Sequence, residues 1–355
     1  MTLEDLGWTD AFRAAFAEHA AKGLVPGRVI AQRGMLVLAT ERGEVLATSS
    51  GRLRHDANDA GDLPTVGDWV AIQMPPEGDQ GRIQAVLPRK SAFTRKAAGK
   101  KTSGQAVAAN VDTVFLLCGL DGDYNPRRLE RYLVGTWESG ARPVVLLNKA
   151  DACADPESVR LEVEAIAFGV PVHVCSAKTG DGVAEIATYL RRGETIALLG
   201  SSGVGKSTLI NRLLGEQLQR TLEVRAHDAR GRHATTHREL FLAPSGALVI
   251  DTPGMRELQL WDSDEGLEAT FGDIEEVAAG CAYGNCRHET EPDCAVRDAI
   301  EAGTLDPERL ASWRKLQKEA ASLRIRTDAL ARSKEKQKIK SVHKAMREQY
   351  KLRDR

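Results

Sequence analysis

Residues 200–207 read Gly200-Ser201-Ser202-Gly203-Val204-Gly205-Lys206-Ser207. This stretch follows a short apolar run and matches a phosphate-binding loop. The glycines let the backbone curl so that its N–H groups point at phosphate oxygens, and the following helix adds the positive end of its dipole. Lys206 would then reach the β- and γ-phosphates, Ser207 would ligate Mg²⁺, and Thr208 would lie beside the same nucleotide. The stretch therefore predicts a nucleoside triphosphate site at the end of a buried strand.

A second pattern, which precedes the loop in the chain, is typical of guanine recognition. It consists of Asn148-Lys149-Ala150-Asp151 and the later Ser176-Ala177-Lys178. Guanine offers two donors on one edge, and the Asp151 carboxylate matches both. Asn148 would tie the base-binding loop to the rest of the site, and the Lys149 stem would lie along the purine. The Ala177 N–H would meet the guanine O6, so the sequence favours GTP over ATP.

A third pattern follows the phosphate loop. The apolar run Ala247–Ile250 leads into Asp251-Thr252-Pro253-Gly254. Asp251 would hold Mg²⁺ through water, and the Gly254 N–H would meet the γ-phosphate. An ordinary GTPase carries the phosphate loop first and the guanine motif last. Here the same set is present in rotated order, so the chain resembles a circularly permuted GTPase.

The segment Arg230–His237 lies where a first switch belongs, between the two phosphate motifs. Thr235 and Thr236 are both available to place a hydroxyl on Mg²⁺, and the sequence does not choose between them. Met255 occupies the position where Ras-like enzymes carry the glutamine that orients the attacking water. We therefore expect slow intrinsic hydrolysis, with His233 as the candidate for orienting the water. An exposed switch histidine without a catalytic role is the alternative.

Around these motifs the chain alternates between strands and helices. Expected strands cover Val111–Leu120, Pro143–Leu147, Val172–Cys175, Ile196–Leu199 and Glu239–Ala243, with helices after Asn125-Pro126 and Asp155-Pro156. This alternation predicts a parallel sheet with helices on both faces. Ligands bind beyond the carboxyl ends of such strands, and the motifs fall there.

The region before this α/β domain has a different texture. Residues 1–26 predict a short helical lead-in, and residues 27–97 contain five short alternating runs separated by glycine-containing turns. Five strands, with a polar connection after the third, predict an OB-fold β-barrel, a fold that often binds nucleic acid. A purely structural spacer is the alternative.

Near the C-terminus, Cys281, Cys286, His288 and Cys294 lie within fourteen residues. Three thiolates and an imidazole form a closed ligand set for one structural, tetrahedral Zn²⁺. The alternatives are a reduced cysteine cluster or a disulfide. A helix is expected after Asp306-Pro307, so this region predicts a zinc-binding helical subdomain.

Composition and charge narrow the function class. The 355 residues are 42% hydrophobic and 28% charged, as in an ordinary globular protein, and no run reaches the roughly 18 apolar residues of a membrane span. We expect a cytoplasmic monomer with no membrane segment. The net charge is −1, but residues 331–355 hold ten Lys and Arg against three Asp and Glu. The segment Arg89–Lys101 is also basic, and two such runs suggest an anionic partner or merely a solvated tail and linker.

These patterns give a multidomain α/β chain with six segments. They are the lead-in 1–26, the barrel 27–97, a basic linker 98–110, the permuted GTPase domain 111–262, the zinc-binding subdomain 263–330 and a basic tail 331–355.

The whole set resembles the ribosome small-subunit-dependent GTPase A family. The most specific matches are Gly231-Arg232-His233, Thr235-Thr236-His237-Arg238-Glu239-Leu240, Asp251-Thr252-Pro253-Gly254 and the Cys3His cluster with Glu291-Pro292. The family pattern usually has threonine in place of Ala234 and often an aromatic residue in place of Met255.

The resemblance implies a late assembly factor for the small ribosomal subunit, which binds its rRNA in the GTP state, hydrolyses GTP when stimulated by the subunit, and leaves with GDP. Two alternatives stay open. One is a GTP-gated RNA-binding module in which hydrolysis is incidental. The other is a permuted GTPase that serves a large-subunit or non-ribosomal partner.

Overall fold

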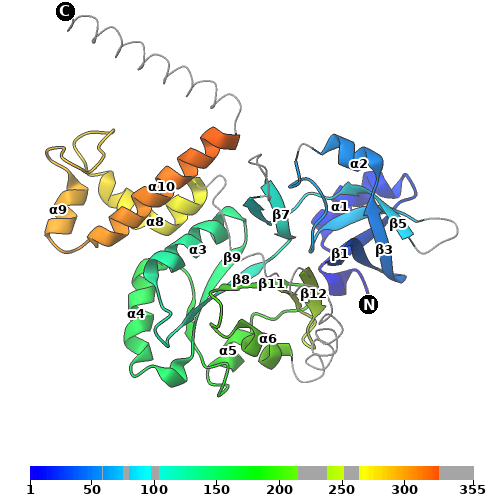
Figure 1. Cartoon of the computed structure of the whole chain (residues 1–355), viewed down its shortest axis with the longest axis horizontal. Helices are drawn as coiled ribbons and strands as arrows, with labels where there is room; N and C mark the ends of the chain where they lie inside the picture. The colour runs from blue at the N-terminus through cyan, green and yellow to red at the C-terminus, as the bar shows by residue number, and fades with distance from the viewer. Residues whose placement is uncertain (58, 75–79, 97–103, 215–237, 252–263, 328–355) are drawn as a thin grey trace, which may run out of the picture. The chain divides into compact units, whose positions relative to one another are not determined.

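The computed structural model describes residues 1–57, 59–74, 80–96, 104–214, 238–251 and 264–327 (Figure 1). The chain divides into two compact units. Unit 1 comprises residues 1–97 and 104–259, and unit 2 comprises residues 98–103 and 260–355. The barrel and the α/β domain thus belong to one unit.

Five strands of unit 1 close into a barrel. They are β1 (Val25–Arg33), β2 (Met35–Thr40), β3 (Gly43–Ser49), β4 (Trp69–Gln73) and β5 (Gln80–Val86). Their order is β1-β2-β3-β5-β4, and β4 pairs with β1 to complete the ring. Only the β3–β5 pairing is parallel. The predicted OB-type barrel is therefore confirmed.

Short helices accompany the barrel, namely η1 (Glu4–Leu6), α1 (Asp10–Ala20) and α2 (Gly51–Asp56). The Thr9 side chain accepts from Phe12 N and so begins α1. Helix α1 then places Phe12 and Phe16 beside Trp8, whose ring centroid lies 4.6 Å from that of the buried Trp69. The lead-in thus closes the barrel core with aromatic rings.

The expected linker is wrong in part. Strand β7 (Gly104–Ala109) occupies most of its second half and pairs antiparallel with β6 (Ala92–Lys96). The apolar run from Ala106 to Ala109 is buried, which gives the segment a reason to fold as a strand. The basic residues before this apolar run favoured a linker over a strand in the sequence.

Six strands form the sheet of the α/β domain. They are β8 (Thr113–Gly119), β9 (Arg142–Asn148), β10 (Val172–Val174), β11 (Thr195–Gly200), β12 (Arg238–Leu242) and β13 (Leu248–Asp251), in the order β10-β9-β8-β11-β13-β12. All are parallel except β12, which runs antiparallel to β13. The sheet is therefore mixed, because the short turn from β12 into β13 reverses the chain.

Helices cover both faces of this sheet, as predicted (Figure 1). One face buries α3 (Pro126–Glu138) and α4 (Pro156–Ile166), and the other buries α5 (Val183–Ala187) and α6 (Lys206–Leu214). The short η2 (Ala150–Ala152) follows β9. Asn125 and Asp155 cap α3 and α4 at the positions that the sequence indicated.

The barrel and the α/β sheet are continuous because β1 also pairs with β12. Arg28 on β1 is 1% exposed at this junction. Its guanidinium donates to the Leu6 carbonyl, to Gly67 O at 3.3 Å and to Thr195 Oγ1 at 2.7 Å. Burial lowers the pKa of Arg28 to about 10. One buried cation thus joins the lead-in, the barrel and β11.

Unit 2 contains three described helices, α8 (Asp264–Ala278), α9 (Ala295–Glu301) and α10 (Pro307–Thr327). The predicted helix after Asp306-Pro307 is confirmed as α10. Arg309 on α10 bonds both carboxylate oxygens of Asp273 on α8 at 2.7 Å and lies over the Phe271 ring at 4.9 Å. This contact pins the two helices together.

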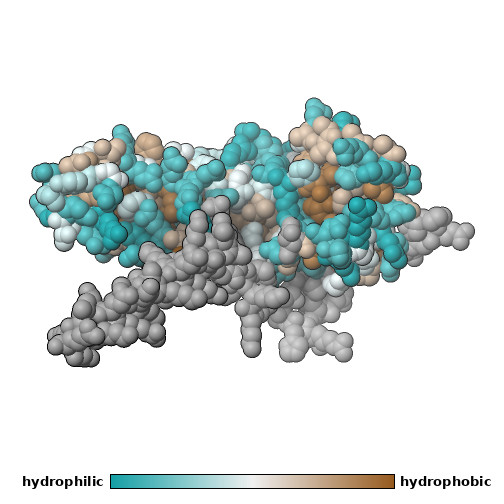
Figure 2. Space-filling model, turned by 90° about the horizontal axis from the view of Figure 1, so that it is seen from above, coloured by the Kyte–Doolittle hydropathy of each residue, from teal (hydrophilic) through white to brown (hydrophobic). Residues whose placement is uncertain are grey.

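Three findings bear on the expected partners. Within the described chain no helix has the length and apolarity needed to cross a membrane. The face in Figure 2 is mostly hydrophilic, with hydrophobic residues in separate small patches. Part of the basic segment Arg89–Lys101 stabilises the fold and is not available to a partner, because Arg89 pairs with Asp68 at 2.8 Å and Lys90 pairs with Asp112.

Candidate functional site: a guanine nucleotide site and a Cys3His cluster

The phosphate loop joins β11 to α6, as predicted. Gly200 has φ +153°, and a Cβ there would lie 2.6 Å from Leu117 O of the neighbouring strand. Lys206 Nζ donates to the carbonyls of Gly200 and Ser201 at 2.8 Å and 2.5 Å, so it lies inside the curve of the loop. The loop thus needs a residue without a side chain at its start, and its lysine faces inward.

The amide groups of Gly203 and Gly205 have no acceptor among the described residues. They stand just before the first residue of α6, where backbone N–H groups and the helix dipole favour an anion. Ser207 and Thr208 are exposed beside them. This donor set fits the phosphates of a nucleotide.

Asn148 links the guanine motif to the phosphate loop. Its side chain is buried, donates to Val204 O at 2.8 Å and accepts from Ala177 N at 2.8 Å. Gly205 has φ +103°, and a Cβ there would lie 2.3 Å from Asn148 Nδ2. The sequence-predicted tie between the two motifs is therefore a direct contact.

Asp151 lies beside the Ser176-Ala177-Lys178 segment. Its carboxylate accepts from Ser176 Oγ at 2.7 Å and lies 3.6 Å from Lys178 Nζ. The Ser176 hydroxyl, followed by Lys178, holds the pKa of Asp151 below its ordinary value. The carboxylate stays charged and solvent-accessible, as an acceptor for two guanine donors requires.

Helix α6 also fixes the guanine segment. Arg212 donates to Ala177 O at 2.8 Å and to Lys178 O at 2.7 Å. The helix that begins at the phosphate loop therefore positions the base-binding segment as well.

Two acidic residues after β8 were missed by the sequence reasoning. Asp121 pairs with Lys149 Nζ, and this hydrogen bond lowers the pKa of Asp121. Asp123 accepts from Ser201 Oγ and pairs with Arg128 at 2.9 Å. The available signal was their place directly after a buried strand, at the edge where the nucleotide motifs gather.

Several predicted site residues cannot be placed. His233, Thr235, Thr236, Gly254 and Met255 lie outside the described residues. Asp251 ends β13, which runs parallel to β11, so its backbone lies at the expected edge of the sheet.

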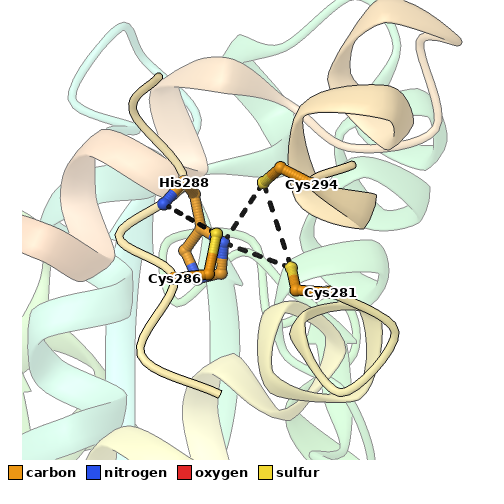
Figure 3. A group of neighbouring side chains, drawn as sticks. All are labelled: Cys281, Cys286, His288 and Cys294. Carbon is orange, nitrogen blue, oxygen red and sulfur yellow. Dashed lines mark hydrogen bonds between the residues drawn. The ribbon is translucent and has the colours of Figure 1, made fainter. Parts of the chain in front are cut away.

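The predicted zinc ligands come together in unit 2 (Figure 3). The ligand atoms of Cys281, Cys286, His288 and Cys294 all lie within 4.8 Å of one another. His288 Nδ1 is 3.5 Å from Cys281 Sγ and 3.4 Å from Cys294 Sγ, and those two sulfurs are 3.9 Å apart. All six cysteines are free, which excludes the disulfide alternative in this structure.

These distances fit a tetrahedral ion. With Zn–S of about 2.3 Å and Zn–N of about 2.0–2.1 Å, tetrahedral geometry places sulfurs about 3.8 Å apart and a nitrogen about 3.6 Å from each sulfur. The cluster therefore has the donor set and the spacing of a structural zinc site.

Neighbouring groups hold the loop that carries Cys286 and His288. Arg314 on α10 donates to the carbonyl oxygens of Arg287 and His288 at 2.7 Å and 2.8 Å. Glu291 accepts from the amides of Arg287, Glu289 and Thr290. The bonds from these amides, first that of Arg287, lower the pKa of Glu291 to about 2.

The fold and the nucleotide site define the class. A guanine motif that precedes its phosphate loop in the chain, with both motifs meeting at one sheet edge, is a circularly permuted GTPase domain. The chain matches the RsgA GTPase family model over residues 86–261, and relatives over its whole length extend that match. The chain belongs to the RsgA GTPase family.

Two relatives carry the name small ribosomal subunit biogenesis GTPase RsgA. The protein from Opitutus terrae is 48% identical over 100% of both chains, and that from Syntrophotalea carbinolica is 46% identical over 96% of each. The crystal structure of YjeQ from Thermotoga maritima is similar with a TM-score of 0.60 and 28% identity, covering 84% of this chain and 98% of that one. YloQ, described as a circularly permuted GTPase, gives 0.58 and 26%, covering 84% and 96%.

Proposed function

We propose that this protein binds the small ribosomal subunit and its rRNA in the GTP state, acts in late maturation of the subunit, and leaves after subunit-stimulated hydrolysis of GTP. The observation that carries the proposal is the 48% identity, from end to end, with a small ribosomal subunit biogenesis GTPase. The contact between Asn148 and the phosphate loop supports it, because it joins base recognition to the phosphate site.

In the nucleotide site the protein's own groups have separate tasks. Asp151 accepts the two guanine donors, and the Lys149 stem covers the base. The Ala177 amide, which here donates to Asn148 Oδ1, would turn to O6 when guanine binds. The loop residues Gly200–Gly205 and the lysine hold the phosphates, with Lys206 on the β- and γ-phosphates. Ser176 and Arg212 keep the base-binding segment in position.

Magnesium fits the same edge of the sheet. Ser207, Asp251 and either Thr235 or Thr236 are the proposed ligands, and Gly254 would meet the γ-phosphate. When bound, Mg²⁺ neutralises charge that develops on the phosphates. His233 is the proposed group that orients the attacking water.

The Cys3His cluster is proposed to hold one structural Zn²⁺. All four positions of the tetrahedron are then filled by the chain, so the ion would hold the fold and do no chemistry. We further propose that the protein acts as a monomer in the cytoplasm, where ribosomal subunits are assembled.

The test is steady-state GTP hydrolysis with small subunits, with large subunits and with neither. We expect strong stimulation by small subunits alone, and we expect His233→Ala to lower the stimulated rate by about 10²–10⁴-fold. Equal slow rates under all three conditions would reject the proposed function. Equal stimulation by large subunits would reject the assignment of the partner.

Lys206→Ala separates this function from a GTP-gated RNA-binding module. An enzyme-driven cycle loses turnover, and the protein stays bound to the subunit. A module in which hydrolysis is incidental would bind and leave the subunit as the wild type does.

A further inference from the structure

A cavity of about 300 Å³ lies in unit 1. It is lined by Gln32 from β1, Arg54 from α2, Thr65 from the loop before β4, Gln105 from β7 and Arg238 from β12. A volume of this size is at the lower end of the range for small-molecule sites. Neither the nucleotide site nor the Cys3His cluster uses it.

The lining of this cavity is short of negative charge. Among the described residues, two arginines line it and no carboxylate does. Arg238 is 8% exposed, and among the described residues its one hydrogen-bond acceptor is Ala106 O at 3.4 Å. A guanidinium carries five N–H donors, so most of its bonding capacity is unused there.

A third arginine, Arg95, adds to the positive charge near the cavity. Burial, and then repulsion from the nearby Arg95, lower the pKa of Arg238. Arg95 itself bonds Gln105 Oε1, which is neutral, at 3.3 Å. Burying a cation without a counter-charge is costly, so an anion would relieve this site.

A buried hydroxyl without a partner in the described part of the chain lies behind the cavity wall, and it does not face the cavity. Thr65 is 2% exposed, and its Oγ1 has no hydrogen-bond partner within the described chain. Asp68 bonds the Thr65 amide, but Arg89 occupies both of its carboxylate oxygens at 2.8 Å. Buried polar groups are nearly always paired, so the guanidinium of Arg238, with its one acceptor among the described residues, indicates a ligand with oxygen atoms.

We propose that this cavity binds a phosphate group through Arg238 and the more exposed Arg54. A guanidinium matches phosphate with two parallel hydrogen bonds. The phosphate could belong to a free small molecule or to an RNA backbone. Because Gln32 pairs with Arg238 across β1 and β12, the bound phosphate would lie where the barrel meets the α/β sheet.

The test uses the full chain saturated with a non-hydrolysable GTP analogue and Mg²⁺, so that the γ-phosphate position of the nucleotide site is also filled. Inorganic phosphate is titrated by calorimetry into the wild type, Arg238→Gln, Arg54→Gln and Thr65→Val. The matched control is Arg52→Gln, because Arg52 lies on the same helix but pairs with Asp56 and does not line the cavity. We expect affinity to fall about tenfold or more in Arg238→Gln and Arg54→Gln, and not in Thr65→Val, whose hydroxyl does not face the cavity, or in the Arg52→Gln control.

Arg238 is buried, so its loss can destabilise the fold, whereas Arg54 is exposed and keeps the test decisive. Undetectable phosphate binding by the wild type would overturn the proposal. Equal binding by wild type and Arg54→Gln would mean an adventitious ion only. A short oligouridylate then identifies the source. If it displaces phosphate from the wild type, and its own binding is weaker in Arg54→Gln, the source is an RNA backbone; no displacement from the wild type indicates a free small molecule.

Discussion

The nucleotide site of unit 1 and the Cys3His cluster of unit 2 relate to their surroundings in opposite ways. The nucleotide motifs lie on a sheet with hydrophobic clusters on both faces, so the fold exists first and positions the site. In unit 2 the four ligands lie in the segment between α8 and α9, outside both of these hydrophobic clusters. There the proposed zinc would hold the fold, as in other small metal-stapled regions.

Removal of zinc should therefore have the largest effect on folding, and this effect should be confined to unit 2. Structural zinc contributes about 10–16 kcal/mol to folding in small domains, so chelation or Cys294→Ser should unfold the segment around the cluster. Hydrogen exchange would detect lost protection in residues 279–306, while GDP affinity stays unchanged. Cys153→Ser in unit 1 is the control. Intact protection after chelation would contradict the comparison.

Loss of the phosphate-loop lysine should abolish chemistry without disturbing either fold. Lys206→Ala removes a cation from the charge that develops on the phosphates, so kcat should fall by about a hundredfold or more. Single-turnover hydrolysis measures this, with the exposed Lys22→Ala as a control. A rate within a few-fold of the wild type would show that Lys206 does not act on the phosphates.

A methyl group at the contact between the two motifs should weaken the nucleotide site while sparing unit 1 as a whole. In Gly205→Ala the new Cβ would meet Asn148 Nδ2, and the positive φ adds strain of about 1–3 kcal/mol. We expect guanine nucleotide affinity to fall by about tenfold to a hundredfold, as measured by fluorescent GDP titration. Gly203→Ala is the control, because Gly203 also has a positive φ but an added Cβ there would meet no atom within 4 Å. The difference between the two variants measures the effect of the clash with Asn148.

The smallest effect should come from the hydroxyl that holds the guanine-binding carboxylate. Ser176→Ala removes one hydrogen bond to Asp151, which costs about 0.5–1.5 kcal/mol. The pKa of Asp151 should rise toward its ordinary value, so GTP affinity should begin to fall at a higher pH than in the wild type. Affinity measured between pH 7 and pH 4 checks this, and identical pH profiles would contradict it.

Much of this arrangement could be predicted because the motifs are local. The phosphate loop, the guanine motif and the four zinc ligands each depend on neighbouring residues in the chain, and the described ones lie together as expected. The starts of α3 and α4 could be predicted for the same reason, because Asn125 and Asp155 cap the helices that directly follow them.

Long-range pairings could not be predicted in this way. Nothing near Arg28 in the chain indicates that it would be buried against Thr195, and nothing near Arg238 indicates its pairing with Gln32. The antiparallel β12 and the β6–β7 pair also depend on partners that the local pattern does not specify. The roles of Asp121 and Asp123 depend on their contacts with Lys149 and Ser201, which are distant from them in the chain.

The most direct test of the proposed switch is co-sedimentation with purified ribosomal subunits in three nucleotide states. We predict that the protein pellets with small subunits when a non-hydrolysable GTP analogue is bound, and that binding is much weaker with GDP or without nucleotide. Large subunits should retain none of it. Equal binding to small subunits in all three states would contradict a GTP-controlled cycle, whatever the rate of hydrolysis.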